Sequence, residues 1–247
     1  MTIITENYKK SDYFVGKKVG LIALRTDHLI EDALSHILHH RDISMLTNRI
    51  TFNDPINQQN LLAMEQDLDR CCHDLLPNKD VDVVIFGCSS GTVAIGESLL
   101  EEKITRIKPS AKVTNPVTAA MAAFAKLGVK KVSIVTPYIE EVNQSMAEFF
   151  TEKGLEVLNV TGFGVHNDED ITRIDPEAIV SAAKEHIAAG GEALFLSCTA
   201  MRSIEAIQQL EEALNIPVVT SNQALCWHAL TLLDLPTSGL PYGKLFQ

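Results

Sequence analysis

Short apolar runs alternate with amphipathic stretches along this chain. The runs at residues 17–24, 81–87, 131–137, 193–197 and 216–221 have the length of strands, and the run at 81–87 is apolar on both faces, as buried parallel strands are. Residues 29–40 (LIEDALSHILHH) instead place apolar side chains at helical spacing. The alternation of strand and helix predicts an α/β fold in which parallel sheets are flanked by helices.

The second half of the chain repeats the pattern of the first. KKVGLIAL at Lys17 matches KKVSIVTP at Lys130, and VDVVIFGCSS at Val81 matches GEALFLSCTA at Gly191. VTNPVTAAMAAF at 113–124 matches VTSNQALCWHAL at 219–230. The matches keep their order and a nearly constant offset, which indicates an internal duplication, although buried strands also resemble one another by chance. We therefore expect two similar lobes with the site in the cleft between them, where the carboxyl ends of the strands meet.

Composition and charge narrow the class of protein. The hydrophobic share of 46% and charged share of 21% are those of a globular chain, and no apolar run reaches the length of a membrane span. The net charge of −11 argues against non-specific nucleic-acid binding. The polar start MTIITENYKKSDYF lacks the apolar core of a signal peptide, so we expect a cytoplasmic protein with no membrane and no nucleic-acid partner.

Five cysteines, without a C-x-x-C pair, are expected to be free thiols in a reducing compartment. Cys88 in FGCSSGT and Cys198 in FLSCTAM occupy equivalent places in the two repeats, each between a strand and a predicted helix. A helix N-terminus lowers the pKa of a thiol and its N–H groups cradle a carboxylate. Two thiols on opposite sides of one carbon can act as nucleophile and proton donor, or as base and acid, without a metal or organic cofactor. The alternative is two small buried hydrophobic residues.

The motifs GCSSGT at 87–92, VTPY at 135–138, SCTAMR at 197–202 and PVVTSNQALCWHAL at 217–230 resemble the aspartate/glutamate racemase superfamily. The branch is that of maleate cis–trans isomerase, arylmalonate decarboxylase and the ectoine-utilisation proteins. The resemblance implies two lobes related by a pseudo-twofold axis, the first formed by residues 1–116 plus about 223–247 and the second by 117–222. It also implies cofactor-independent chemistry on a small carboxylic acid, and a homo-oligomer.

Both cysteines are present, whereas the decarboxylases of this branch retain only the second, so the resemblance favours an isomerase or a racemase. By this resemblance Cys88 would add to the alkene and Cys198 would manage the proton. The resemblance and the two cysteine turns together suggest a set of substrate-binding candidates: Arg25, Asp27, Ser89, Ser90, Gly91, Thr92, Tyr138, Asn167, Thr199 and Ala200. Among these, Asn167 lies in a loop composition that is common in any protein.

Asp27 departs from the pattern, because maleate isomerases carry an asparagine at this position. A carboxylate would repel a substrate carboxylate, so Asp27 suits an amino-bearing or amidine-like substrate, while Arg25 could still bind a carboxylate. Thr26 or Asp27 could equally cap the helix that begins near Leu29. The acidic stretch 168–170 is interpreted as a solvated face.

Three functions follow in order. The first is a two-cysteine isomerase of the maleate isomerase type. The second is an ectoine-utilisation type racemase or isomerase of an amino-bearing carboxylate, or a lyase like arylmalonate decarboxylase. The third is a cytosolic protein that binds a small molecule without reacting with it. Cys71, Cys72, His73 and Asp74 look like a metal cluster but lie on one predicted helix and point apart, so no metal site is predicted.

Overall fold

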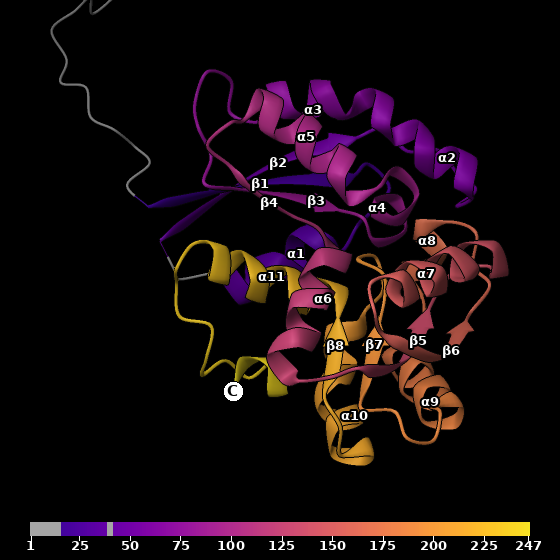
Figure 1. Ribbon diagram of the computed structural model, residues 1–247. Coiled ribbons are helices and arrows are strands. Elements are labelled where there is room, and N and C mark those ends of the chain that lie inside the picture. Colours follow the sequence, from indigo (N-terminus) through magenta and orange to yellow (C-terminus); the bar gives the residue numbers. More distant parts are fainter. Residues whose placement is uncertain (1–15, 39–41) are drawn as a thin grey trace, which may run out of the picture.

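Two parallel sheets of four strands form the framework of the computed structural model, which describes residues 16–38 and 42–247 (Figure 1). The first sheet has the order β2-β1-β3-β4, and the second has the order β6-β5-β7-β8. The strands are β1 (Lys17–Leu24), β2 (Ile43–Ile50), β3 (Val83–Gly87), β4 (Lys112–Thr114), β5 (Lys131–Thr136), β6 (Glu156–Gly162), β7 (Ala193–Leu196) and β8 (Val218–Thr220). The same strand order in both sheets agrees with the duplication, and the predicted α/β fold is confirmed.

Helices cover both faces of the first sheet, with α3 and α5 on one side and α1, α6 and α11 on the other (Figure 1). Most of the longer helices bury one apolar face, whereas α11 is buried almost all round. In α1 the buried face is Ile30, Ala33, Leu34, Ile37 and Leu38. The helices are α1 (Ile30–Leu38), α2 (Gln58–Ala63), η1 (Met64–Asp67), α3 (Leu68–Asp74), α4 (Ser89–Ile95), α5 (Glu97–Ile107), α6 (Pro116–Leu127), α7 (Glu140–Glu152), α8 (Asp168–Thr172), α9 (Pro176–His186), η2 (Ser203–Ala206), α10 (Ile207–Leu214), α11 (Ser221–Leu232) and η3 (Lys244–Phe246).

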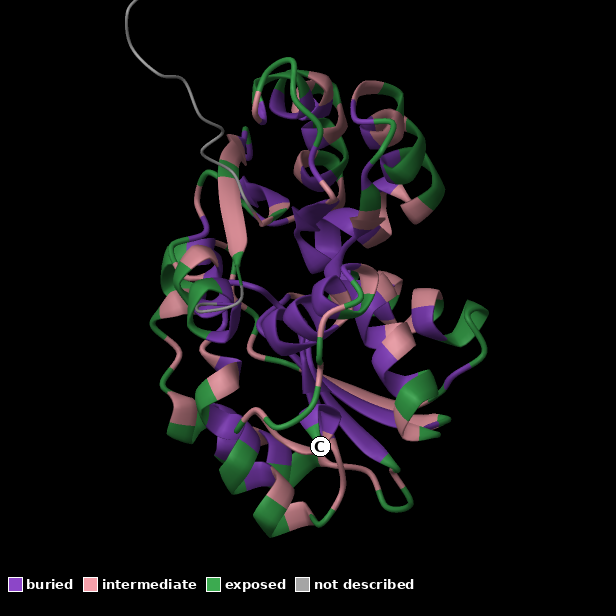
Figure 2. Ribbon diagram, turned by 90° about the vertical axis from the view of Figure 1, so that its left-hand side faces the viewer, coloured by how far each residue is buried: buried purple, intermediate pink, exposed green. Residues whose placement is uncertain are grey.

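The central strands are mostly buried, whereas the edge strands β2 and β6 are largely half-exposed (Figure 2). Strands β3 and β7 are buried along their whole length, and their apolar runs were predicted as strands from the sequence. The outer strands β2 and β6 are half-exposed and mix polar with apolar residues, so the apolar pattern did not reveal them. The predicted helix that carries Cys71 to Asp74 is the short α3, which follows α2 and η1.

Helix α11 returns the chain to the first sheet. It begins at the end of β8 and packs against α1, α6, β3 and β4. These contacts agree with assigning the C-terminal segment to the first lobe, and the lobe boundaries given above stay a prediction. Among the described residues, no helix has the length and apolarity of a transmembrane segment. His39 and His40, which end the predicted first helix, lie outside the described residues.

Candidate active site

Cys88 follows directly after β3 and caps the first turn of α4. Its backbone is extended, and its sulfur accepts a hydrogen bond from the backbone N–H of Gly91 at 3.2 Å. The hydroxyl of Ser90 lies 3.7 Å from the same sulfur, and Thr92 donates to the Cys88 carbonyl at 2.6 Å. A Cβ added at Gly91 would lie 3.0 Å from the Cys88 sulfur, so glycine allows the helix to approach the thiol.

Cys198 occupies the equivalent place after β7, but the element that follows it differs. The prediction of a helix opened by Cys198 is wrong, because Thr199 and Ala200 form a turn and only the short η2 and then α10 follow. The Cys198 backbone N–H instead donates to the hydroxyl of Ser221 in α11 at 3.0 Å. The backbone of Ala200 also forms a hydrogen bond to the Cys198 side chain.

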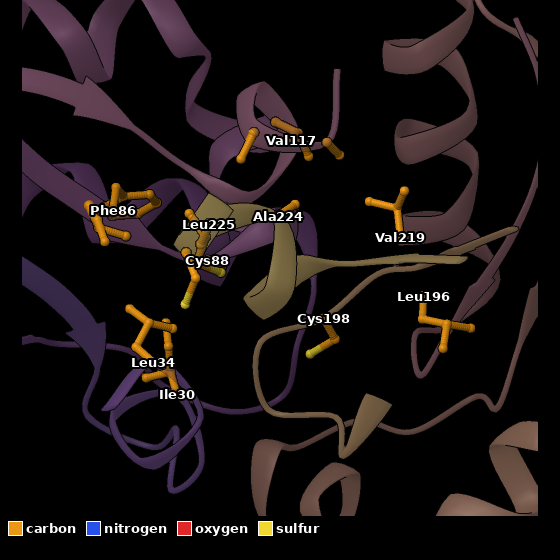
Figure 3. Close-up of a cluster of buried hydrophobic side chains, with 14 of the residues drawn as sticks. Ile30, Leu34, Phe86, Cys88, Val117, Leu196, Cys198, Val219, Ala224 and Leu225 are labelled. Atoms are coloured by element: carbon orange, nitrogen blue, oxygen red, sulfur yellow. The ribbon is translucent and has the colours of Figure 1, made fainter. Parts of the chain in front are cut away.

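The two cysteine segments are bonded to each other and to α11. Ser221, which accepts from Cys198, lies 2.9 Å from the hydroxyl of Ser89, the residue after Cys88. The hydroxyl of Thr199 donates to the carbonyl of Gly87 at 3.2 Å. Cys88 and Cys198 are only 5% and 4% exposed, and Figure 3 shows them in one cluster with side chains of α11. The structure therefore brings together the two thiols that the repeat predicted.

Tyr138, at the end of the β5 strand, joins the same cluster. Its side chain is 2% exposed and forms hydrogen bonds with the side chains of Cys198 and Ser90. Its backbone N–H donates to the Thr136 hydroxyl at 3.0 Å, which fixes the turn. Burial and the two neighbouring thiols raise the pKa of the Tyr138 phenol, so this side chain is a neutral hydrogen-bond donor.

Burial decides the protonation of both thiols. It raises the pKa of Cys88 to about 12, against which the hydrogen bond from Gly91 is a smaller effect. Burial likewise raises the pKa of Cys198, and the carboxylates Asp168 and Asp27 raise it further. The expectation that a helix N-terminus lowers these pKa values is therefore wrong for the free protein. Both cysteines are neutral thiols before a substrate enters.

Asp27 both caps α1 and faces the thiols. Its Oδ1 accepts from the backbone N–H groups of Leu29 at 2.8 Å and Ile30 at 2.9 Å. The side chain is 1% exposed, and its Oδ2 accepts no hydrogen bond from any described residue. Burial raises the pKa of Asp27, with the two backbone donors and the Thr199 hydroxyl acting in the opposite direction. The capping role is therefore confirmed, and the second carboxylate oxygen stays free of the cap.

Asp168 acts on the charge of both thiols, which the sequence did not reveal. Its prediction as part of a solvated face is wrong: it is 5% exposed and accepts a hydrogen bond from the Thr26 hydroxyl at 2.5 Å. Burial raises the pKa of Asp168 to about 6, and the neighbouring Asp27 adds to the rise. Acidic residues that begin a helix are usually exposed, so there was little reason in the sequence to expect a buried carboxylate here. The one available signal was the position of Asp168 next to the candidate Asn167.

Two other candidates are directed away from the thiols. The guanidinium of Arg25 donates to the Asn53 side chain at 2.7 Å and the residue is exposed. Asn167 caps α8: its Oδ1 accepts from the Asp170 backbone and its amide donates to the Asp170 carboxylate, both at 2.8 Å. The structure therefore brings neither side chain to the cysteines.

The cysteines of α3 do not form a metal site with the described acidic residues around them. Within residues 16–38 and 42–247, no group of three His, Cys, Asp or Glu side chains is arranged to hold a metal ion. Cys71 and Cys72 are buried in α3, where burial raises the pKa of the two thiols to about 11 and about 12. Cys72 therefore packs as a small apolar group, whereas the Cys71 sulfur accepts a hydrogen bond from Arg70 at 3.3 Å and donates to the Arg49 carbonyl at 3.6 Å.

Known proteins share this architecture. A maleate isomerase from Geobacillus stearothermophilus is 23% identical over 89% of this chain and 93% of its own. An arylmalonate decarboxylase from Bordetella bronchiseptica is 31% identical over 54% of this chain and 57% of its own. A crystal structure of a cysteine-to-serine mutant of Nocardia farcinica maleate cis–trans isomerase superposes with a TM-score of 0.85 at 20% identity, covering 93% of this chain and 98% of that one. This last likeness establishes the shared fold.

Residues 69–246, which include both cysteines, Tyr138 and Asp168, match the arylmalonate decarboxylase family. The match covers well over half of the chain, and its relatives include the maleate isomerases that the cysteine motifs resemble. The chain therefore belongs to the arylmalonate decarboxylase family, within the aspartate/glutamate racemase-like superfamily.

Proposed function

We propose that this protein is a cofactor-independent isomerase that uses Cys88 and Cys198 on a small carboxylic acid. The observation that carries the proposal is the joining of the two cysteine segments at one buried site by Ser221 and Thr199. The relatives support it, because several are maleate isomerases and the similar Nocardia farcinica structure holds a covalently bound succinylcysteine intermediate.

The reaction begins with addition of the Cys88 sulfur to one alkene carbon. As the carbon–sulfur bond forms, the π electron pair moves to the neighbouring carbon and takes the proton of Cys198. The Cys88 proton replaces it through the hydroxyls of Ser90 and Tyr138, which have hydrogen-bond contacts with the two thiols. The carbon–carbon bond, now single, rotates. The same transfers in reverse then re-form the double bond in the trans arrangement and release Cys88.

Hydroxyl donors would hold the substrate carboxylate. The side chains of Ser90 and Tyr138 are buried beside both sulfurs, where a hydrogen bond to a charged acceptor is stronger than at the surface. The other candidates in the two cysteine turns carry no charge and position the turns: Ser89, Thr92, Thr199 and Ala200. The proposed location is the cytoplasm and the proposed assembly is a homo-oligomer. The free thiols, the net charge and the family resemblance support these two proposals.

Two alternatives remain within the same fold. Asp27 and Asp168 favour an amino-bearing substrate, as in a racemase or isomerase of the ectoine-utilisation type. The family match and the Bordetella bronchiseptica relative favour a decarboxylase, but the presence of both thiols supports isomerisation over it.

The test is proton NMR of the purified protein with maleate in deuterated water. We expect wild type to form fumarate and Cys88→Ser to form none, because serine is a far weaker nucleophile than a thiolate. Asp27→Asn is measured in parallel, since removal of this negative charge should favour a dicarboxylate substrate.

The matched control is Cys71→Ser, which changes another buried cysteine that lies in α3. It should retain the wild-type rate once its folding is verified by circular dichroism. Absence of fumarate with both wild type and Asp27→Asn would overturn the proposed function.

A further inference from the structure

We propose that the substrate of this site bears, besides its carboxylate, a cationic nitrogen group of the ammonium or amidinium type, which binds between the carboxylates of Asp27 and Asp168. This inference rests on the proposed function and names the substrate class of the same site.

The two acids belong to different parts of the chain and meet through one residue. Asp27 follows β1, and Asp168 begins α8 after β6. Thr26, the neighbour of Asp27, donates its hydroxyl hydrogen to Asp168 at 2.5 Å. Both carboxylates are at least 95% buried and both act on the charge state of Cys88 and Cys198. They therefore form one acidic wall beside the thiols.

One oxygen of this wall lacks a donor. The Oδ1 atom of Asp27 is occupied by the N–H groups that open α1, whereas Oδ2 is buried without a partner among the described residues. The hydroxyl of Thr199 is close enough to lower the pKa of Asp27, but it donates its single hydrogen to the carbonyl of Gly87. A buried carboxylate oxygen without a donor is costly, so a ligand N–H is the missing partner.

Arg49 and His28 lower the pKa of Asp27 and Asp168 less than burial raises it, and most cations near this wall have other partners. The guanidinium of Arg49 donates to the carbonyls of Leu24, Arg25 and Asp27 and pairs with Glu31. The side chain of Arg25 is turned to Asn53, as described above. His28 is exposed, and Arg173 pairs with Glu169 and Asp170 at the surface. Among the described residues, Asp54 adds further negative charge near Asp168.

A cationic substrate group also accounts for how the buried thiols become reactive. Asp27 and Asp168 both raise the pKa of Cys88 and Cys198. A bound cation neutralises these carboxylates and thereby favours the thiolate only in the complex. A second carboxylate in the same place would have the opposite effect on the thiols and would bind more weakly beside the wall.

The test is isothermal titration of the full chain with paired probes. The ω-amino acids β-alanine, 4-aminobutyrate and 5-aminovalerate are compared with malonate, succinate and glutarate, which have the same numbers of carbons. We expect at least one amino acid to bind about tenfold or more tightly than its dicarboxylate partner, because like charges at a contact disfavour the wrong ligand. Equal or tighter binding of all three dicarboxylates, or no binding of any amino acid, would overturn the inference.

The variants Asp27→Asn and Asp168→Asn assign the effect to the wall. Asparagine keeps the cap of α1 and an acceptor for Thr26, so both variants should fold. Each variant should lower the affinity for the amino acid by about tenfold and raise the affinity for the dicarboxylate. Glu169→Gln, which removes the same charge from the exposed neighbour of Asp168, should change neither affinity. An unchanged preference in both wall variants would contradict the inference.

These titrations measure binding and not turnover. The substrate class can therefore be contradicted independently of the proposed function. An ammonium preference without thiol-dependent turnover of maleate by wild type or Asp27→Asn would contradict the isomerase proposal alone. Fumarate formation without an ammonium preference would contradict the substrate class alone.

Discussion

At the scale of single residues, burial outweighs local electrostatics at the two cysteines. The N–H of Gly91 points at the Cys88 sulfur, as expected at a helix start, yet removal from water raises the pKa of this thiol to about 12. A group with this pKa is thiolate in only about one molecule in 10⁵ at pH 7. The Cys88 thiol of the free site is therefore unreactive, and a bound substrate must favour the thiolate.

This protonation state predicts slow alkylation of Cys88 in the folded protein. Labelling by iodoacetamide, followed by mass spectrometry of the peptide that contains Cys88, should rise about tenfold with each pH unit between 7 and 9, because the rate follows the thiolate fraction. The same cysteine should react rapidly at pH 8 in urea, where burial is lost. Fast labelling at neutral pH that does not depend on pH would contradict a raised pKa.

At the scale of elements, the first turn of α11 joins the two cysteine segments. The hydroxyl of Thr220 accepts from the backbone of Gln223 and the Gln223 side chain accepts from the backbone of Thr220, so a capping box fixes this turn. The next residue, Ser221, then meets both Ser89 and the backbone of Cys198. A helix start that belongs to neither cysteine segment therefore sets the position of both.

Ser221→Ala tests this role. It leaves the buried N–H of Cys198 without an acceptor, which should lower the free energy of unfolding by about 1–3 kcal/mol. It should also lower kcat by about tenfold, since a small displacement of a reacting group has a large effect on rate. Urea denaturation and turnover measure the two effects.

Thr231→Ala is the matched control on the same helix, because its hydroxyl donates only to the Trp227 carbonyl and the residue is exposed. Its effect on stability should stay within about 0.5 kcal/mol. Unchanged kcat in Ser221→Ala would show that the hydroxyl does not position the thiol.

At the scale of the whole molecule, the two halves of the chain meet through a few polar contacts near the site. The backbone N–H of Ile56 donates to the carbonyl of His166 at 2.7 Å, and Thr26 donates to Asp168. Lys153 of α7 pairs with Glu97 of α5 on the other side. Asp168 therefore lies in a contact between segments that are far apart in the sequence, and its ionisation acts on the stability of the molecule.

The pKa of about 6 predicts how stability depends on pH. Between about pH 4 and pH 6 the folded protein binds more protons at Asp168 than the unfolded chain, so this residue makes the free energy of unfolding fall as pH rises. The difference from the ordinary value of 3.8 corresponds to about 3 kcal/mol. Asp168→Asn should therefore gain about 2 kcal/mol relative to wild type between pH 4 and pH 7, because the unfolded carboxyl is already partly ionised at pH 4.

Urea denaturation at the two pH values measures this gain, and Glu169→Gln supplies the comparison for removal of an exposed negative charge. If the stability difference between wild type and Asp168→Asn is the same at pH 4 and pH 7, the pKa of Asp168 is not raised in the folded protein.

The sequence by itself determined the elements whose signal is local. The apolar runs of β3 and β7 and the helical spacing of α1 lie within a few residues, and the repeat placed Cys88 and Cys198 at equivalent strand ends. The sequence did not predict edge strands such as β2, because one side of them meets solvent and carries polar residues.

Only the tertiary structure decided the charge and contacts of the site. That Asp168 is buried, that Arg25 turns to Asn53, and that α11 joins both cysteine turns depend on residues more than 20 positions apart in the sequence. The thiol pKa also depends on the whole surroundings, because desolvation sums over every neighbour that excludes water. Local sequence therefore fixes which groups can react, and packing of distant segments fixes whether they are charged and where they point.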